Sequence, residues 1–250
     1  MIRKIALATV FAATASAALA ADLPSTKGPA PFIAPAPIFT WTGFYVGGQI
    51  GYSWRNDRMI ETNAADALVG TGSDLGATGV VGGLHIGYNH QIQGTAVVLG
   101  IEADLEAAGL NRTSAVELNP AGVPYANGAP TDYSYGTKTS WQGSIRGRLG
   151  YSFGQALLYA TGGVAFANMR TFYTSFGASQ AFSDTRAGWT LGAGLEYALS
   201  RNWSIRAEYR YTDFGSFTDS PATAGAFWNG FNDRHSIKDQ AVRVGVSYRF

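Results

Sequence analysis

From Trp41 to the C-terminus, apolar and polar residues alternate along most of the chain. In the first such stretch Phe44, Val46 and Ile50 share one face, while Tyr45 and Gln49 share the other. A period of two is typical of β-strands with one apolar face. Each run is long enough for a tilted strand to cross a bilayer, which takes about 9–11 residues. The eight runs are Trp41 to Trp54, Gly79 to Gln91, Val97 to Ala107, Trp141 to Phe153, Leu157 to Asn168, Arg186 to Tyr197, Trp203 to Thr212 and Val242 to Phe250. The fifth run alternates least cleanly, and we expect Leu158, Val164 and Phe166 to form its apolar face.

The connections between these runs alternate between short and long. Short ones lie near Gln93-Gly94, Gly154-Gln155 and Ser200-Arg201-Asn202. Long ones cover roughly 56–78, 108–139, 169–185 and 215–238. Short periplasmic turns and long extracellular loops are typical of outer-membrane barrels, and an even strand number places both termini on the periplasmic side. We therefore predict an all-β fold: an eight-stranded antiparallel transmembrane β-barrel with long extracellular loops and short periplasmic turns.

The positions of the aromatic residues indicate which face meets the lipid. Aromatic side chains such as Phe44, Trp54, Trp141 and Tyr151 stand near the ends of the apolar rows, with aliphatic residues or glycine between them. That pattern predicts two interfacial girdles around an aliphatic band, with the apolar face outward. The opposite face then lines the lumen, and we expect its charged residues to pair across it. This predicted lumen charge network consists of Glu102, Asp104, Glu106, Arg146, Arg148, Glu196, Arg206, Glu208, Arg210 and Arg243. Four glycines are expected to make room for the long arginines: Gly47, Gly51, Gly83 and Gly87.

The N-terminus carries the marks of a secretory signal peptide. Basic residues Arg3 and Lys4 precede an alanine-rich apolar segment that ends in Ala18-Leu19-Ala20. This A-x-A site predicts cleavage between Ala20 and Ala21. The apolar run is too short for a membrane-spanning helix, which needs about 20 apolar residues. We therefore divide the chain into a signal peptide (1–20), a proline-rich periplasmic linker (21–40) that holds five of the nine prolines, and the barrel (41–250).

Composition agrees with a membrane barrel. The chain has 32 glycines and no cysteine, so neither a lipid anchor on cysteine nor a disulfide framework is available. Charged residues make up only 14%, against about 25% in a soluble domain. Without the signal peptide 16 basic residues face 17 acidic ones. Such a balance provides no basic field for nucleic acid, and we expect no nucleic-acid partner.

Several motifs together resemble a known family. They are Trp41-Thr42-Gly43-Phe44-Tyr45-Val46-Gly47-Gly48 after a proline-rich leader, Gly100-Ile101-Glu102-Ala103-Asp104, Tyr159-Ala160-Thr161-Gly162-Gly163-Val164-Ala165, and the final Tyr248-Arg249-Phe250. This combination, spread over about residues 40–250, resembles the outer-membrane β-barrel family of small porin-like and immunogenic surface proteins. It is more distantly similar to the OmpA transmembrane domain. The resemblance implies an abundant structural or surface-exposed barrel. It also implies that Tyr248 and Phe250 form an assembly signal, with the barrel-assembly machinery and periplasmic chaperones as partners.

Two groups of residues could suggest chemistry. Asp233-Arg234-His235-Ser236 contains an Asp-x-His and a His-Ser pair, such as barrel hydrolases use at their rim. It lies in a predicted loop without a recognisable partner carboxylate, so we interpret it as a solvated polar loop. Haemin ligation by His235 is a weaker alternative. Glu102-x-Asp104-x-Glu106 could hold Ca²⁺, but the lumen alternation explains the same spacing. We expect no catalytic, cofactor or metal site.

Three function classes remain open. The favoured one is a structural, surface-exposed barrel that stabilises the envelope and presents loops for binding or adhesion. Its partners would be outer-membrane lipids, lipopolysaccharide and a possible host or surface ligand. A small diffusion porin is the alternative, and a rim-type barrel hydrolase is the least favoured class.

Overall fold

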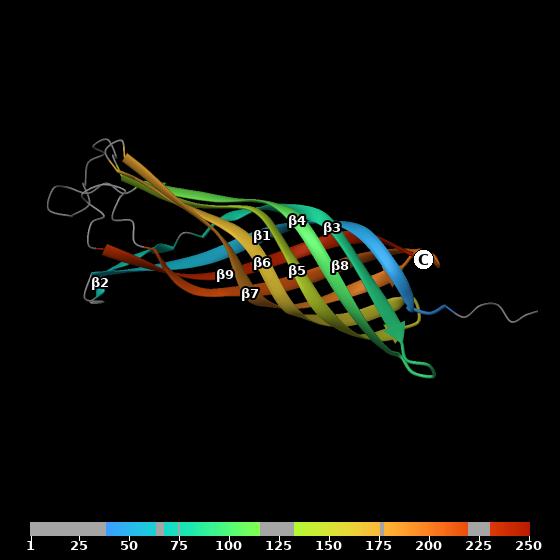
Figure 1. Cartoon of the computed structure of the whole chain (residues 1–250). Helices are drawn as coiled ribbons and strands as arrows, with labels where there is room; N and C mark the ends of the chain where they lie inside the picture. The colour runs from blue at the N-terminus through green and yellow to red at the C-terminus, as the bar shows by residue number, and fades with distance from the viewer. Residues whose placement is uncertain (1–38, 64–67, 75, 116–132, 176–177, 220–230) are drawn as a thin grey trace, which may run out of the picture. The chain divides into compact units, whose positions relative to one another are not determined.

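The computed structural model describes residues 39–63, 68–74, 76–115, 133–175, 178–219 and 231–250, and these residues form an antiparallel β-barrel (Figure 1). The predicted signal peptide, its predicted cleavage site and most of the predicted linker lie outside the described residues. The strands are β1 (Gly43–Asn63), β2 (Leu68–Asp74), β3 (Thr78–Gln91), β4 (Val97–Ala115), β5 (Tyr133–Phe153), β6 (Ala156–Ser175), β7 (Ala178–Ala198), β8 (Trp203–Asp219) and β9 (Phe231–Arg249). No helix in the described part of the chain is long and apolar enough to span a membrane.

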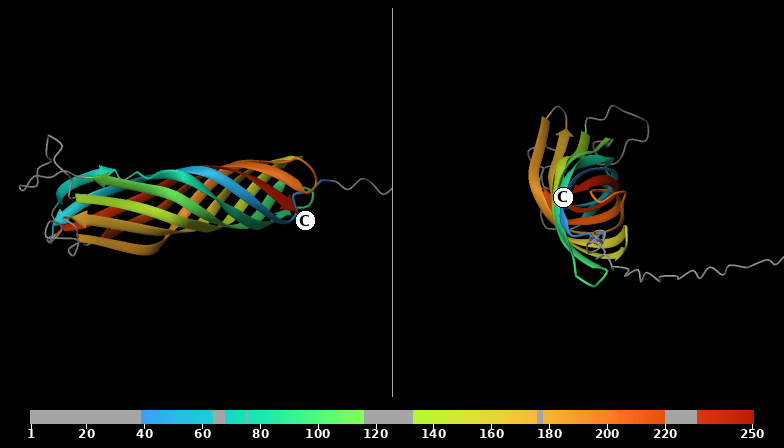
Figure 2. Two further views of the ribbon diagram at one scale, coloured as in Figure 1. Left: turned by 90° about the horizontal axis from the view of Figure 1, so that it is seen from above. Right: turned by 90° about the vertical axis from the view of Figure 1, so that its right-hand side faces the viewer.

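Eight of these strands close the barrel, as predicted. Each of them pairs antiparallel with its neighbours, and β1 closes the circle by pairing with β9. Among the described strands, the short β2 pairs with the C-terminal part of β1 only. It therefore lies on the same side of β1 as β3, in line with β3 and further along the barrel. Phe250 N–H donates to Phe44 O at 3.0 Å, so the C-terminus lies beside the start of β1 (Figure 2).

Three short connections lie at the end of the barrel that holds the C-terminus, which we call the turn end. They span 92–96, 154–155 and 199–202, in agreement with the predicted turns. Gly94 and Gly154 have φ of 73° and 71°, a left-handed conformation that glycine adopts without steric cost. The opposite end is called the loop end.

The apolar face points outward, as the aromatic pattern predicted. Leu191, Val244 and Ile145 are 56%, 53% and 52% exposed, whereas charged residues on the alternate positions are buried. The fifth run follows the same rule, because Leu158, Val164 and Phe166 all face outward. The protein thus presents an apolar outer wall and a polar lumen.

Aromatic rings gather at the two ends of this wall. Near the turn end Phe44 packs on Tyr88 at 4.7 Å and Trp203 on Tyr248 at 5.1 Å between ring centroids. On the loop-end side Trp189 packs on Tyr211 at 5.3 Å. The two groups fit the predicted pair of interfacial girdles.

The strands continue far beyond the predicted runs, which corrects the predicted long loops. Much of 56–78, 108–139, 169–185 and 215–238 is strand: residues 56–63, 68–74, 108–115, 133–139, 169–175, 178–185, 215–219 and 231–238. The hydrophobic period fades there because both faces of a strand can be polar outside the lipid. Irregular pairing between Thr139 and Gln142 also shifts the alternation of β5 by one position, because the consecutive residues Ser140 and Trp141 are both exposed.

Towards the loop end, the described strands separate into two sheets. Pairing between β7 and β8 ends at Trp189–Asp213, while β7 stays paired with β6 as far as Ala178. On the other side, pairing between β3 and β4 ends at Thr78–Asn111. The extensions of β4–β7 form one sheet and those of β8, β9, β1 and β2 form another, and they diverge in Figure 1.

Candidate functional site: the lumen

All ten residues of the predicted lumen charge network lie inside the barrel. The most exposed of them, Asp104, is only 8% exposed. Strand alternation places them there: three carboxylates come from β4, two arginines from β5, Glu196 from β7, three residues from β8 and Arg243 from β9. Five acidic and five basic side chains therefore share one space.

Arg146 is the centre of the network. Its Nη1 atom donates to Glu208 Oε1 at 2.7 Å, and its Nη2 lies 3.2 Å from Asp104 Oδ2. Nη2 also bonds Glu102, and Nη1 donates to Thr161 Oγ1 at 2.9 Å. Arg146 thus joins β4 to β8 across the lumen.

The other four arginines complete the pairing. Arg210 bridges Asp104 at 3.1 Å and Glu208 at 2.9 Å. Arg243 Nε lies 2.9 Å from Glu106. The remaining ion pairs join Arg206 to Glu102 and Arg148 to Glu196. Each of the five carboxylates has an arginine partner, so the buried set is electrically balanced, as buried ions require.

Several lumen residues were not part of the predicted network. Tyr45 Oη donates to Glu102 at 2.8 Å, and Arg148 stacks on the Tyr159 ring at 3.7 Å. Alternation correctly predicted that Tyr45 lies on the lumen face, whereas Tyr159 lies in the run with the least regular pattern. Arg55 pairs with Asp239 at 3.5 Å, and both residues lie just outside the ends of the predicted runs.

Apolar side chains fill the lumen on either side of the charges. At the turn end one cluster contains Trp41, Val98, Leu157, Tyr159 and Ala198. Towards the loop end a second contains Ala165, Ala167, Met169, Phe214 and Ile237. β6 contributes to both clusters, so its lumen face is partly apolar. This explains why the fifth run alternated poorly.

Trp41 seals the turn end. It is fully buried, its Nε1 donates to Gly154 O at 3.1 Å, and its backbone N–H donates to Gln91 Oε1 at 3.0 Å. Arg249 stacks on it at 4.9 Å. The segment before β1 is therefore fastened to the end of β3 and to the turn that follows β5.

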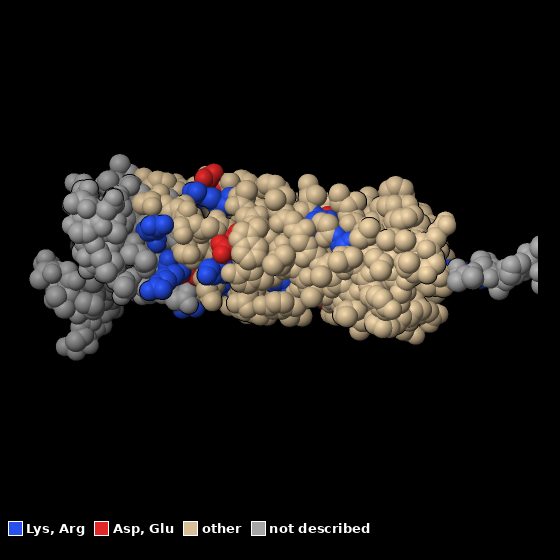
Figure 3. Space-filling view, turned by 90° about the horizontal axis from the view of Figure 1, so that it is seen from below, with Lys and Arg blue, Asp and Glu red and all other residues tan. Residues whose placement is uncertain are grey.

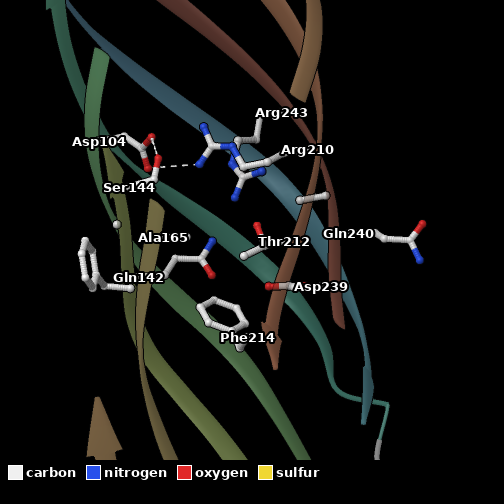
Figure 4. Close-up of a pocket in the computed structure, with 13 residues that line it drawn as sticks. Asp104, Gln142, Ser144, Ala165, Arg210, Thr212, Phe214, Asp239, Gln240 and Arg243 are labelled. Atoms are coloured by element: carbon white, nitrogen blue, oxygen red, sulfur yellow. Dashed lines mark hydrogen bonds and ion pairs between the residues drawn. The ribbon is translucent and has the colours of Figure 1, made fainter. Parts of the chain in front are cut away.

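One small cavity lies in the lumen. A cavity of about 10 Å³ lies between the network and the second apolar cluster, with Asp104, Gln142, Arg210 and Phe214 among its walls. That space holds about one water molecule. Figure 4 shows the Asp104 carboxylate beside Ser144, whose hydroxyl donates to it at 2.6 Å.

The predicted role of the lumen glycines is correct at one position only. A Cβ atom on Gly51 would lie 2.8 Å from Arg243 Cγ, so this glycine makes room for an arginine. Gly47 instead faces the His85 ring, Gly87 faces the Tyr45 ring and Gly83 faces the backbone of β4. The bulky neighbours are mainly aromatic rings and main chain, which cannot be inferred without the register between the strands.

Among the described residues, the candidate catalytic and metal-binding side chains do not form a catalytic arrangement. Asp233 to Ser236 lie in β9, which corrects the predicted loop. The side chain of His235 is not among those that the structure describes. His85 is buried and its Nε2 lies 2.8 Å from Ser247 Oγ. No cluster suited to a metal ion occurs among the described residues, and the Glu102, Asp104 and Glu106 carboxylates bind arginines instead.

The predicted assembly signal and cleavage site have different outcomes. The rings of Tyr248 and Phe250 contact each other edge to face, with 5.1 Å between their centroids, and Phe250 is 75% exposed at the turn end. Ala20 and Ala21 lie outside the described residues. Both roles stay predictions.

Known proteins are similar to this chain in sequence and in fold. The family model described as "Outer membrane protein beta-barrel domain" matches residues 5–250. The 31 kDa outer-membrane immunogenic protein of Brucella melitensis is 33% identical over 99% of this chain and 100% of its own length. A 22 kDa outer membrane protein of Rhizobium leguminosarum is 34% identical over 86% of this chain and 80% of its own. Among solved structures, OprG from Pseudomonas aeruginosa is similar with a TM-score of 0.51 and 12% identity, covering 86% of this chain and 99% of its own. The Escherichia coli protease OmpT has a TM-score of 0.50 and 10% identity, with the same two coverages. At such identities these two structures support the fold alone.

Proposed function

This chain belongs to the outer-membrane β-barrel domain family, and on that premise we propose that it is a surface-exposed structural barrel. It stabilises the envelope and presents its loop end for binding or adhesion. The observation that carries the proposal is the filled, charge-balanced lumen. A barrel with such a lumen serves as a rigid support, and its exposed end is the part available to partners. The name "immunogenic" of its Brucella relative supports surface exposure.

The lumen argues against a wide diffusion pore. An eight-stranded barrel leaves an interior that side chains can fill. Here Arg146 and its carboxylate partners cross the lumen, and apolar clusters lie on both sides of them. A hydrated ion would have to displace paired charges and then pass apolar rings.

Single-channel recording in planar bilayers tests this proposal. The wild-type protein should show no stable openings on the nanosiemens scale. Arg146→Ala should show small leak currents, because it removes the side chain that joins β4 to β8. Large, stable openings in the wild type would favour the alternative function, a small diffusion porin.

The proposal includes an orientation: the turn end faces the periplasm, where the assembly machinery reads Tyr248 and Phe250. The chain lacks cysteine, so single cysteines can report it. Thr113 is exposed at the loop end and Gln93 at the turn end. In intact cells an impermeant maleimide should label Thr113→Cys but not Gln93→Cys. The reverse pattern would overturn the orientation.

We also propose that the protein is not an enzyme. The His85–Ser247 contact is the one described pair that could suggest a nucleophile and its base. Both residues are at most 2% exposed, and His85 Nδ1 has no hydrogen-bond partner among the described residues. Without an orienting carboxylate and access for a substrate, this pair serves packing rather than catalysis.

A further inference from the structure

The outer wall carries a row of polar side chains just beyond the apolar band. Backbone pairing places Asn111, Lys138, Arg170 and Ser183 side by side on β4, β5, β6 and β7. All four are exposed, and alternation directs them outward. Adjacent strands lie about 4.8 Å apart. We call these four residues the cationic row.

The centre of this row is a pair of like charges. Lys138 and Arg170 are direct cross-strand partners, and like charges in that position destabilise a sheet. No described carboxylate lies within ion-pair distance of either residue. By contrast, the outward-facing Lys238 stands directly opposite Asp213. The cationic row therefore concentrates positive charge that the described residues leave uncompensated.

The position of the row along the barrel indicates where an anion would come from. Phe166 is an outward aromatic residue four positions before Arg170 on β6, and Trp141 lies three positions after Lys138 on β5. Aromatic residues of this kind mark the interface between the lipid tails and the headgroups. On the face shown in Figure 3, charged side chains likewise gather towards the loop end, while the turn-end third is free of them.

We propose that the cationic row binds the phosphate group of a phosphorylated glycolipid in the outer leaflet. Arg170 can hold two phosphate oxygens with its planar fork, while Lys138 adds a second positive charge. The side chains of Asn111 and Ser183 flank the pair and can donate further hydrogen bonds. This inference rests on the proposed orientation, which places the loop end on the outside of the cell.

The test uses the full chain in detergent micelles and counts retained lipid by native mass spectrometry. The probe is bisphosphorylated lipid A, compared with the same glycolipid after removal of its phosphates. The wild type should retain the phosphorylated form preferentially. The double variant Lys138→Gln/Arg170→Gln should bind it about tenfold more weakly, because charge-assisted hydrogen bonds are lost. The matched control Lys238→Gln, at the same outer wall, should bind like the wild type. A gel-mobility shift on heating verifies that each variant is folded.

Three results would overturn the proposal. Equal binding by the double variant would place the lipid elsewhere, and equal binding of the dephosphorylated glycolipid would reduce the contact to the acyl chains. Competition by inorganic phosphate at equal phosphate concentration would identify a site for free anions instead. The micelle experiment has no sidedness, so failure of the orientation appears in the maleimide experiment and not in this one.

Discussion

The membrane-level barrel and its loop-end extensions are built from the same strands, yet their pairing differs. From the turn end up to Trp189 on β7, every described strand has two neighbours. Among the described strands, the extension of β7 from Ala178 to Gly188 pairs with β6 alone. In lipid an unpaired backbone group costs several kcal/mol, so closure is obligatory. In water an open edge is solvated. The surrounding solvent therefore decides where the barrel must close.

The largest expected effect comes from breaking ion pairs in the two parts. Arg146→Ala leaves buried carboxylates without their central partner and should lower the free energy of unfolding by about 3–5 kcal/mol. Asp184→Ala breaks a pair with Arg186 in which the side chains of Asp184 and Arg186 are 61% and 29% exposed. Its cost should stay below about 1 kcal/mol. Urea unfolding in lipid vesicles measures both.

Equal losses for the two variants would mean that the lumen is as well solvated as the loop end. A second variant at the same position provides a test in case Arg146→Ala does not fold. Arg146→Lys keeps the charge but loses the fork, so it should recover part of the stability.

A smaller effect is expected on the outer wall. Leu191→Arg places a charge against the lipid tails and should cost about 2–4 kcal/mol, and the same holds for Val244→Arg and Ile145→Arg. Thr185→Arg lies on the same strand as Leu191 but in the extension, where its change should stay within about 0.5 kcal/mol. If Leu191→Arg folded with wild-type stability, the outward assignment of the apolar face would be wrong.

The third prediction perturbs no residue. In amide hydrogen exchange, β7 from Thr190 to Ala198 should exchange only on global unfolding, whereas its extension should exchange through local opening. Exchange is followed in vesicles by mass spectrometry of peptides. Uniform protection along β7 would show that its open edge is covered.

The same difference between the two parts decides how far the sequence could predict the structure. The outward direction of the apolar face, the two aromatic girdles and the short turns could be predicted from the sequence. They could be predicted because lipid and lumen impose opposite polarities on neighbouring residues of a strand. Lys138 and Arg170 escaped notice because strands in water carry no such constraint. Tyr159 escaped for another reason: a lumen layer made of rings removes the contrast on which alternation depends. Partners such as Arg146 and Glu208 could be named as a group but not as a pair, because pairing needs the register across the barrel.

The seal at the turn end also sets an order of events in time. Trp41 precedes every strand of the described barrel, so it is synthesised before them, yet its indole N–H donates a hydrogen bond to Gly154, 113 residues later. Chain closure over such a separation is slow compared with the formation of local hairpins. The first residue of the barrel to be synthesised is thus docked only after the hairpin of β5 and β6 exists. Its passage from water into the lumen therefore marks the completion of assembly at the turn end.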